Sequence, residues 1–407
     1  MNNDRFLIFP WGVLSSRGED AEALLTGIKE CNFNASCFVR PEDFELCRRL
    51  GLTVFCVLPC HEAVKSILYQ QRKNMTADEA AEALKAAIEP ALRDLDEDVF
   101  SIYITDEPGA SLYPELRVLA DCVRRIRPNT QTHINLLPNY AVAGAKDLSQ
   151  LETETYEEYL DRFCAEVNPH AVSVDNYQVH FSNEFTRPGG REKFWNNMLQ
   201  CIDVCKKYGL PFHFVASCCQ LRTDRVIPTF PNLALQAYGA LAAGARALSW
   251  FYYRPRGLYV YCPTDDYDSE IPVKTPVWYL LQEVNRRILA LGTVLYGMEF
   301  NGLYFTDPKT LREGAKSVAE CPALKGFSAD GVCAVGHYTD LDGTPAVLVV
   351  NEDLTKPTRI FPDLGGEIET YNTESESWVS PRLANGRGAL TDLMLEPGCG
   401  LLLRKKK

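Results

Sequence analysis

The chain has 407 residues, of which 46% are hydrophobic and 24% charged, the profile of a globular protein with ample material for a core. This composition excludes disorder, collagen and coiled coil, and the length allows two or three domains, or one large barrel with a small second domain. A formal net charge of −12 argues against nucleic acid or an anionic membrane as a partner, because either requires a basic surface.

Short apolar runs alternate with helical patterns up to about residue 293. The predicted strands are 5–10, 35–40, 52–58, 100–105, 132–137, 171–177, 212–217 and 247–253. A helical pattern follows each strand; the one after Thr76 carries Glu79 three residues on, which is typical of a capping box. Eight strand–helix units predict an α/β fold, a (β/α)8 TIM barrel. An open doubly wound sheet would show a Gly-rich turn after the first strand, and FPWGVLSSRG does not match that pattern.

From about residue 297 the pattern changes to runs of period two, such as VCAVGHYTD and PAVLVVNED, separated by turn dipeptides. This part predicts a small antiparallel β-sandwich. We therefore expect a barrel domain in residues 1–296 and a C-terminal β-sandwich in residues 297–407.

The fifteen cysteines are odd in number and scattered, and no CxxC pair recurs at zinc-ribbon spacing. We expect them to be reduced thiols packed as small hydrophobes, which favours a cytoplasmic location. The N-terminal MNNDRFLIFPWG lacks the features of a signal peptide, and no apolar run approaches 18 residues. No metal, cofactor or membrane partner is expected.

The strongest candidate for chemistry is the end of the fourth strand, Thr105-Asp106-Glu107-Pro108. Active sites of such barrels lie at the carboxyl ends of the strands. Two adjacent carboxylates after a buried strand are costly unless both find hydrogen bonds or water. An alternative is that they cap the following helix, although Glu lacks the short reach of a good cap residue. We predict Asp106, Glu107 and, at the end of the sixth strand, Asp175 as the catalytic carboxylates.

Aromatic, amide and basic side chains also follow the predicted strands. Flat aromatic rings and bidentate amides suit a sugar, although each aromatic residue could instead belong to the core. The predicted substrate-binding residues are Trp11, Arg40, Asn135, Asn139, Tyr140, Asn176, Tyr177, His180, Trp250, Tyr252 and Arg254.

Other barrel chemistries fit the same strand ends less well. A metal-dependent amidohydrolase needs paired histidines on the first strand, and a Schiff-base aldolase needs a lysine at the mouth. His133 and His213 lie in the middle of strands, where buried histidines are more common than ligands. The Cys218-Cys219 pair has no histidine placed to activate it. A set of carboxylic acids remains the best-supported apparatus.

The segments YITDEPGASLYPELRVL, HINLLPNYA, TYEEYLDRFCAEVNPHAVSVDNYQV and LQAYGALAAGARALSWFYY resemble a bacterial group assigned to the glycoside hydrolases. That group is similar to clan A barrel enzymes such as bacterial β-galactosidases, and the resemblance covers the whole barrel. In clan A an Asn-Glu-Pro motif at the end of strand four holds the acid/base glutamate. The resemblance places Glu107 in that role, with Asp106 replacing the asparagine. Clan A's nucleophile glutamate ends strand seven, where this chain reads FHFVASCCQ without a carboxylate.

Two readings accommodate this departure. In the first, Asp175 is the second carboxylate, similar to the strand-six acid of clan D α-galactosidases. A separation from Glu107 of about 5–5.5 Å would then imply retention, and about 6.5–9.5 Å inversion. In the second, the Asp106-Glu107 pair resembles that of substrate-assisted β-N-acetylhexosaminidases: Asp106 orients the substrate's acetamido group and Tyr177 bonds its carbonyl. Both readings keep Glu107 as a general acid whose pKa is raised.

The sequence therefore predicts a glycoside hydrolase acting on a small, imported oligosaccharide or glycoconjugate fragment. Two alternatives stay open. One is a non-catalytic carbohydrate-binding barrel that keeps the mouth without the strand-seven carboxylate. The other is a subunit of a larger assembly, such as a homo-oligomer that uses the β-domain as its interface.

Overall fold

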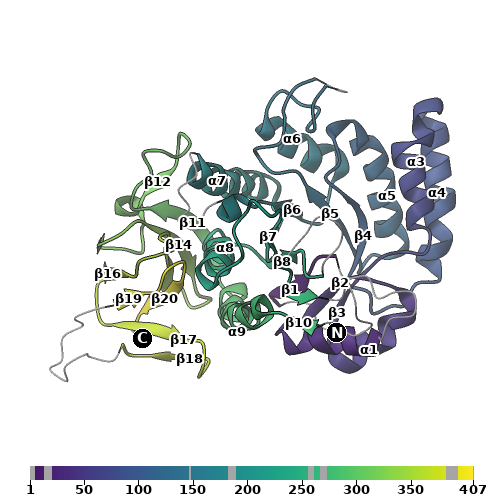
Figure 1. Ribbon diagram of the computed structural model, residues 1–407. Coiled ribbons are helices and arrows are strands. Elements are labelled where there is room, and N and C mark those ends of the chain that lie inside the picture. Colours follow the sequence, from purple (N-terminus) through teal and green to yellow (C-terminus); the bar gives the residue numbers. More distant parts are fainter. Residues whose placement is uncertain are drawn as a thin grey trace.

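The computed structural model describes residues 5–12, 21–145, 148–181, 189–254, 261–265, 273–381 and 393–406. Its largest part is a barrel of parallel strands surrounded by helices (Figure 1). The strands are β1 (Leu7–Pro10), β2 (Ala35–Val39), β3 (Thr53–Cys56), β4 (Ser101–Asp106), β5 (Gln131–Leu136), β6 (Val172–Asp175), β7 (Phe212–Ser217) and β8 (Ala247–Phe251). They are hydrogen-bonded in the order β1-β8-β7-β6-β5-β4-β3-β2, which confirms the predicted (β/α)8 barrel.

The helices that cover the barrel are α1 (Ala21–Glu30), α2 (Phe44–Leu50), α3 (His61–Tyr69), α4 (Ala77–Arg93), α5 (Tyr113–Ile126), α6 (Tyr156–Arg162), α7 (Gly190–Tyr208), α8 (Phe230–Ala242) and α9 (Pro276–Tyr296). Short turns of helix are η1 (Pro41–Asp43), η2 (Gln71–Asn74), η3 (Ala110–Leu112), η4 (Phe163–Val167), η5 (Gln178–Phe181) and η6 (Val318–Glu320). The predicted capping box is present at the start of α4: Thr76 N–H donates to Glu79 (2.8 Å), and Glu79 N–H donates to the Thr76 hydroxyl (3.3 Å).

A side chain closes the barrel between β1 and β2. Asn34, just before β2, accepts from the backbone N–H of Ile8 (2.8 Å) and donates its amide to the carbonyl of Phe6 (2.8 Å). Its own N–H donates to the carbonyl of Ile8 (3.2 Å). Because Asn34 is buried, these bonds satisfy backbone groups that water could not reach.

The interior of the barrel has two unlike halves. The apolar half is supplied mainly by β1, β2 and β3, joined by Val215 of β7 and Ala247 of β8; its other side chains include Leu7, Phe9, Trp11, Ala35, Cys37 and Phe55. The polar half is supplied by β5 to β8; its side chains are His133, Asn135, Ser173, Asp175, His213 and Ser249. The rings of His133 and Phe55 meet edge to face (5.4 Å between centroids), so the two halves join inside the barrel.

The C-terminal region forms two further sheets that share an apolar core. The seven-stranded sheet has the order β12 (Lys316–Ser317), β11 (Glu299–Phe305), β14 (Cys333–Thr339), β15 (Pro345–Asn351), β20 (Gly400–Lys405), β17 (Ile368–Asn372) and β18 (Ser377–Val379). The three-stranded sheet is β13 (Gly326–Ala329), β16 (Thr358–Asp363) and β19 (Leu393–Leu395). A short antiparallel pair, β9 (Thr264–Asp265) and β10 (Val273–Lys274), precedes α9. Val335, Val349, Ile360 and Leu403 belong to the shared core.

The larger sheet packs on the barrel beside α7, α8 and α9 (Figure 1). β14 approaches α8 so closely that a Cβ on Gly336 would lie 2.4 Å from the carbonyl oxygen of Ala242. Next to this contact, buried Glu352 accepts from the Arg191 guanidinium (2.7 and 3.1 Å) and from the Trp195 indole (2.8 Å). A buried carboxylate with these partners ties the sheet to α7.

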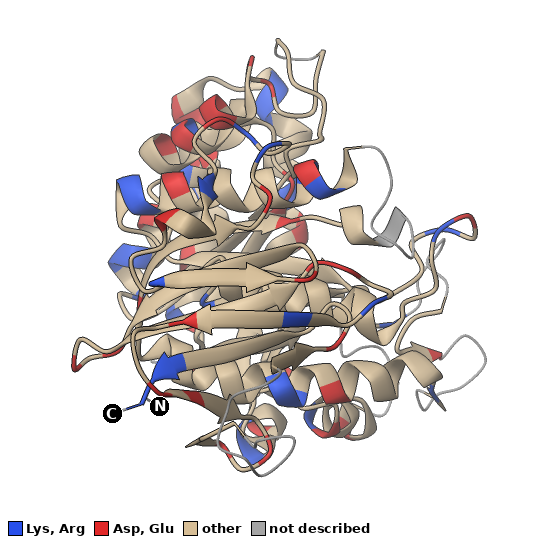
Figure 2. Ribbon diagram, turned by 90° about the vertical axis from the view of Figure 1, so that its left-hand side faces the viewer, with Lys and Arg blue, Asp and Glu red and all other residues tan. Residues whose placement is uncertain are grey.

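In the view of Figure 2, both acidic and basic positions are spread over the helices and loops. Within the described ranges no helix combines the length and the apolar character needed to span a bilayer. None of the fifteen cysteines, all of which lie in the described ranges, forms a disulfide, and all except half-buried Cys60 are buried.

Candidate active site

Two carboxylates leave the end of β4 at the mouth of the barrel. Glu107 has a φ of 48°, a left-handed conformation that is unfavourable for a residue with a side chain. Its N–H donates to the backbone carbonyl of Asn135 on β5 (2.8 Å), which holds the turn in place. Glu107 is exposed, whereas Asp106 beside it is largely covered. Strained backbone that presents an acid at the rim is typical of a functional site.

These acids do not cap the next helix. Neither Gly109 before η3 nor Leu112 before α5 receives a side-chain cap, and the exposed N–H of Ser111 donates to Glu152 instead (2.7 Å). The capping alternative is therefore wrong for both Asp106 and Glu107.

A third acid, Asp175 at the end of β6, lies directly behind Glu107. Its residue is only 1% exposed, and its carboxyl group lies close enough to that of Glu107 for each acid to affect the pKa of the other. The two acids therefore form an interacting pair with one buried and one exposed member.

Asn135 joins all three acids. Its amide Nδ2 donates to Asp106 (3.2 Å) and to Asp175 (3.0 Å), while its backbone carbonyl accepts from Glu107. The Ser173 hydroxyl donates to Asn135 Oδ1 (3.0 Å), which fixes the orientation of the amide. Both amide hydrogens of Asn135 are therefore used by protein carboxylates. Asn135 organises the site, and the prediction that its amide binds a sugar is corrected.

The carboxyl pKa values are shifted in the direction that a general acid requires. Burial raises the pKa of Asp106 to about 7, with the charge of Glu107 adding and the hydrogen bond from Asn135 opposing. Burial also raises the pKa of Glu107, against the hydrogen bond from Asp175. Asp175 is the most deeply buried; burial and the charges of Glu107 and Asp106 raise its pKa well above the usual range. Burial thus favours the protonated form of each of these three carboxyl groups.

The carboxyl groups of a conventional glycosidase pair stand about 5–5.5 Å or about 6.5–9.5 Å apart, with the sugar or a water between them. Asp175 is only 1% exposed, so it is the least accessible of the three acids to a sugar. Its role as the second carboxylate stays a prediction. Asp106 is less deeply buried than Asp175.

Two tyrosines from neighbouring loops face the acids. The backbone N–H of Tyr177 donates to the Tyr140 hydroxyl (3.1 Å), and the ring of Tyr177 stacks on Phe251 of β8 (5.3 Å between centroids). Burial raises the pKa of both hydroxyls, and the negative charge of Asp175 raises each further. The side chains of Tyr140 and Tyr177 therefore lie near Asp175. Their predicted contacts with a substrate stay a prediction.

A pocket of about 450 Å³ lies between the ends of β2 and β3 and the start of α3. Its lining includes Phe38, Arg40, His61 and Tyr103. Tyr103 connects this pocket to the acids: burial raises the pKa of its hydroxyl, and the charges of Asp106 and Glu107 raise it further. The sequence prediction included Arg40 but missed Tyr103. Its inward position on β4 was the available signal, although an irregularity between Tyr103 and Thr105 disturbs the alternation there.

Two further predicted residues lie at the base of the mouth. Trp11 is 4% exposed and meets Phe38 (5.2 Å) and Tyr103 (5.9 Å) edge to face. The ring of Tyr252 lies so close to Gly12 that a Cβ there would be 1.9 Å from it. Trp11 and Tyr252 therefore shape the mouth by packing.

Other predicted substrate residues point elsewhere. Trp250 is buried outside the barrel and donates its indole N–H to Asn285 of α9 (2.8 Å), because alternation along β8 turns it outward. Asn176 donates to Asn197 (2.9 Å) and Asn139 to Gln200 (3.1 Å), both on α7. These three predictions are corrected: the side chains fasten the strand ends to helices.

Arg254, past the end of β8, is 5% exposed. His180 lies in η5, and its side chain is outside the described residues. Neither position therefore adds a described contact to the mouth.

The end of β7 offers no acid among the described residues. Ser217, Cys218 and Cys219 are all buried, and the Ser217 N–H donates to Gln236 of α8 (2.8 Å). Burial raises the pKa of the Cys219 thiol, but hydrogen bonds to Cys262, Tyr252 and Ser217 hold it below the usual value. Because Cys219 is covered, this thiol does not reach the mouth. The described part of the chain also has no group of three or more His, Cys, Asp or Glu arranged for a metal ion.

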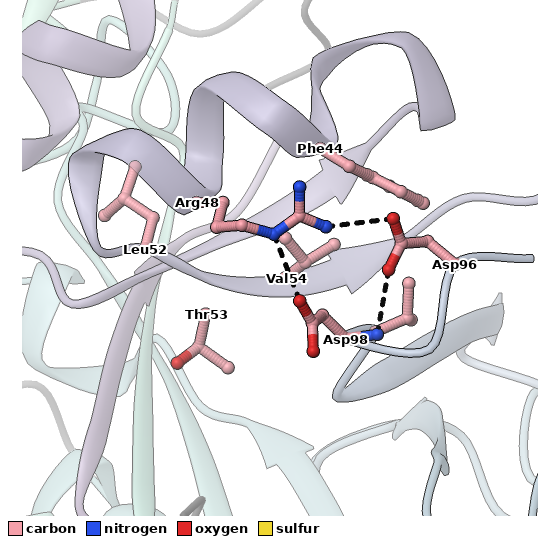
Figure 3. A pocket seen from close by; sticks show the side chains of 8 residues that line it. Phe44, Arg48, Leu52, Thr53, Val54, Asp96 and Asp98 are labelled. Atoms are coloured by element: carbon pink, nitrogen blue, oxygen red, sulfur yellow. Dashed lines mark hydrogen bonds and ion pairs between the residues drawn. The ribbon is translucent and has the colours of Figure 1, made fainter. Parts of the chain in front are cut away.

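A second, much smaller pocket lies at the opposite end of the barrel. Figure 3 shows the Arg48 guanidinium between Asp96 (2.9 Å) and Asp98 (3.0 Å), near the start of β3. This end of a barrel serves stability rather than catalysis, and its carboxylates are already paired with the arginine.

No protein-family model and no curated protein sequence matches the chain. Among solved structures, it is similar to an endo-β-1,4-mannanase from Thermotoga petrophila (10% identity, 88% of this chain and 97% of that one, TM-score 0.48). It is also similar to a β-galactosidase from Halorubrum lacusprofundi (12% identity, 70% and 58%, TM-score 0.49). A mannosidase from Rhizomucor miehei gives 10% identity, 67% and 88%, and a TM-score of 0.44. Such low identities and TM-scores do not carry a substrate or a mechanism to this chain.

Proposed function

We propose that this protein is a glycoside hydrolase in which Glu107 protonates the departing sugar oxygen. The observation that carries the proposal is the position of Glu107 at the mouth: its residue is exposed, its backbone takes a left-handed turn at the end of β4, and burial of the carboxyl group raises its pKa. A raised pKa favours the protonated acid, and an acid at the rim can donate its proton to a leaving group. General acid catalysis of this kind contributes about 10²–10⁴-fold to a rate.

In this proposal the substrate binds in the pocket that Tyr103 connects to the acids. Phe38 and Tyr103 give it aromatic walls, and Arg40 and His61 give it groups that bond hydroxyls. Burial lowers the pKa of His61, so its ring is neutral near pH 7 and both donates and accepts. A volume of about 450 Å³ suits one or two sugar units of a small oligosaccharide or glycoconjugate fragment.

Asp106 is the second carboxylate in this proposal, because Asp175 is covered. Asn135 Nδ2 contacts Asp106, and the charge of Glu107 contributes to the raised pKa of Asp106, so the two acids lie close together at the mouth. This favours substrate assistance, in which the acetamido group of an N-acetylhexosamine attacks the anomeric carbon and Asp106 orients that group. The hydroxyls of Tyr140 and Tyr177, which face the acids, are placed to bond the acetamido carbonyl.

The test is a panel of aryl hexosides and aryl N-acetylhexosaminides assayed with the wild type, Glu107→Gln and Glu97→Gln. Glu97 is an exposed glutamate before the other end of β4, so its substitution controls for the loss of one surface charge. We expect turnover of at least one sugar, a loss of about 10²–10⁴-fold in kcat for Glu107→Gln, and no change for Glu97→Gln. Equal activity of the two variants would remove Glu107 from the mechanism.

The same panel separates the proposal from a carbohydrate-binding barrel. Saturable binding of a sugar without product after prolonged incubation would favour the binding protein. Turnover of N-acetylhexosaminides alone would support substrate assistance, and turnover of simple hexosides would require Asp106 to act on the sugar directly.

A further inference from the structure

The pocket between the ends of β2 and β3 contains an arginine whose guanidinium is available to a ligand. Arg40 follows β2 and lines this pocket, with 30% of its side chain exposed. Its backbone is fixed, because its carbonyl accepts from the N–H of Asp43 (3.0 Å). Its guanidinium donates no hydrogen bond within the part of the chain that the structure describes, and its one ion pair there, with Glu42, is 4.0 Å long. The five N–H donors of this planar group therefore remain open to a ligand.

A second arginine near the end of β4 shows the contrast with a structural role. Arg72 of η2 donates to the carbonyl of Ser111 (2.9 Å), to the Ser111 hydroxyl (2.8 Å) and to Glu115 (3.2 Å). These bonds hold two segments of the chain together. Arg40 makes no such bonds within the described ranges, so its place in the pocket is not explained by folding.

The aromatic wall of the same pocket is held by a strained backbone. Phe38 has a φ of 60°, which is rare for a bulky residue, and it lies where the pairing of β2 with β3 is irregular, between Ser36 and Val39. Its ring contacts that of Tyr103 (4.4 Å between centroids), and the His61 ring contacts Tyr103 as well (5.3 Å). Strain of this kind is concentrated at ligand sites. Flat rings beside an open guanidinium suit a sugar that carries an acid group.

The charges that line the pocket favour a ligand with a single negative charge. Besides Arg40, the charged residues of the lining are Glu42 and Glu62, both solvent-exposed. Burial lowers the pKa of His61, so its ring is neutral near pH 7 and can bond a hydroxyl without adding charge. A carboxylate matches the planar guanidinium with two parallel hydrogen bonds and brings one charge. A phosphate would bring nearly two charges close to the two glutamates.

We propose that this pocket binds a hexuronic acid unit of the substrate and that Arg40 selects it by pairing with its carboxylate. This inference rests on the proposed function, since it names the class of sugar that the glycosidase site accepts. The sugar ring lies against Phe38 and Tyr103, and His61 bonds one of its hydroxyls.

The pocket lies within reach of Glu107. β3 stands between β2 and β4 in the sheet, and neighbouring strands are about 4.8 Å apart, so the ends of β2 and β4 are about 10 Å apart. Tyr103, which lines the pocket, belongs to the same strand as Asp106. The substrate is therefore a short acidic oligosaccharide whose uronic acid lies beside the bond that Glu107 protonates.

The test compares ligands that differ only in their acid group. The probes are methyl β-D-glucuronide and methyl α-D-galacturonide, their methyl esters, the corresponding neutral methyl glycosides, and glucose 6-phosphate. Dissociation constants are measured by ligand-observed NMR with the wild type, Arg40→Gln, Arg40→Lys and the matched control Arg49→Gln. Arg49 of α2 has 59% of its side chain exposed, so its substitution controls for the loss of one positive charge.

We expect the wild type to bind at least one uronide about 10- to 100-fold more tightly than its methyl ester and its neutral analogue, the range of a hydrogen bond to a charged group. Arg40→Gln should abolish this preference. Arg40→Lys should keep only part of it, because an ammonium group lacks the planar fork. Arg49→Gln should leave the preference unchanged, and glucose 6-phosphate should bind more weakly than the uronide. If Arg40→Gln does not fold, the comparison of acid with ester in the wild type decides.

The outcomes separate this inference from the proposed function. Equal binding of the uronides and their methyl esters, or an unchanged preference in Arg40→Gln, overturns the uronic acid assignment while leaving the glycosidase intact. Tighter binding of glucose 6-phosphate overturns it in favour of a phosphorylated sugar. A wild type that prefers the uronide but hydrolyses no aryl glycoside, with or without a uronic acid unit, overturns the proposed function and supports the role of Arg40.

Discussion

The two halves of the barrel interior differ in what they do. β1 to β3 contribute apolar and aromatic side chains that pack against each other, as Phe9 and Phe55 do at 4.2 Å between centroids. β5 to β8 contribute histidine, serine, asparagine and aspartate, of which Asn135 and Asp175 lie directly beneath the acids of β4. One side of the barrel therefore supplies cohesion, and the other supplies the hydrogen bonds that organise the mouth.

The largest effect on stability is expected in the apolar half. Phe55→Ala removes a fully buried ring that contacts Phe9, Phe100 and His133. We expect a loss of about 3–5 kcal/mol in the free energy of unfolding, measured from urea denaturation. A loss below about 1 kcal/mol would show that packing in the apolar half contributes little to the free energy of unfolding.

An intermediate, pH-dependent effect is expected at Asp106. Its pKa rises from 3.8 to about 7 on folding, so the folded protein keeps a proton that the unfolded chain releases between these pH values. Stability therefore falls as the pH rises through this window. Asp106→Asn should stabilise the protein by on the order of 2 kcal/mol at pH 8, with the gain vanishing near pH 4. A gain independent of pH would contradict the assigned burial of this acid.

The smallest effect is expected at His133, in the polar half, whose Nε2 is buried without a partner. Burial lowers its pKa to about 3. The unfolded chain therefore takes up a proton below about pH 6.5 that the folded protein refuses, and stability is lost as the pH falls. His133→Phe should stabilise by about 1 kcal/mol at pH 7, and more at pH 4, the opposite pH trend to Asp106→Asn. Destabilisation at pH 7 would indicate that Nε2 has a bound partner, such as an internal water.

The sequence was sufficient to place the acids at one end of the barrel, because parallel strands bring their carboxyl ends together. For the same reason it was sufficient to place Glu107 and Asp175 at the ends of their strands, whereas their catalytic roles stay predictions. The left-handed turn that presents Glu107 at the rim is encoded by no sequence period. Trp250 and Asn176 were predicted to face the mouth, but their side chains point to helices. Successive side chains of a strand point to opposite faces, so an error of one residue in the predicted strand end moves a side chain to the other face.

The most direct test of the central claim is the dependence of the Glu107→Gln defect on the leaving group. If Glu107 protonates the departing oxygen, the defect should be about 10²–10⁴-fold for an alkyl glycoside, which needs that proton. For a dinitrophenyl glycoside, whose leaving group departs without protonation, the first step should be nearly as fast as in the wild type. An equal defect with both substrates would contradict a proton donated by Glu107.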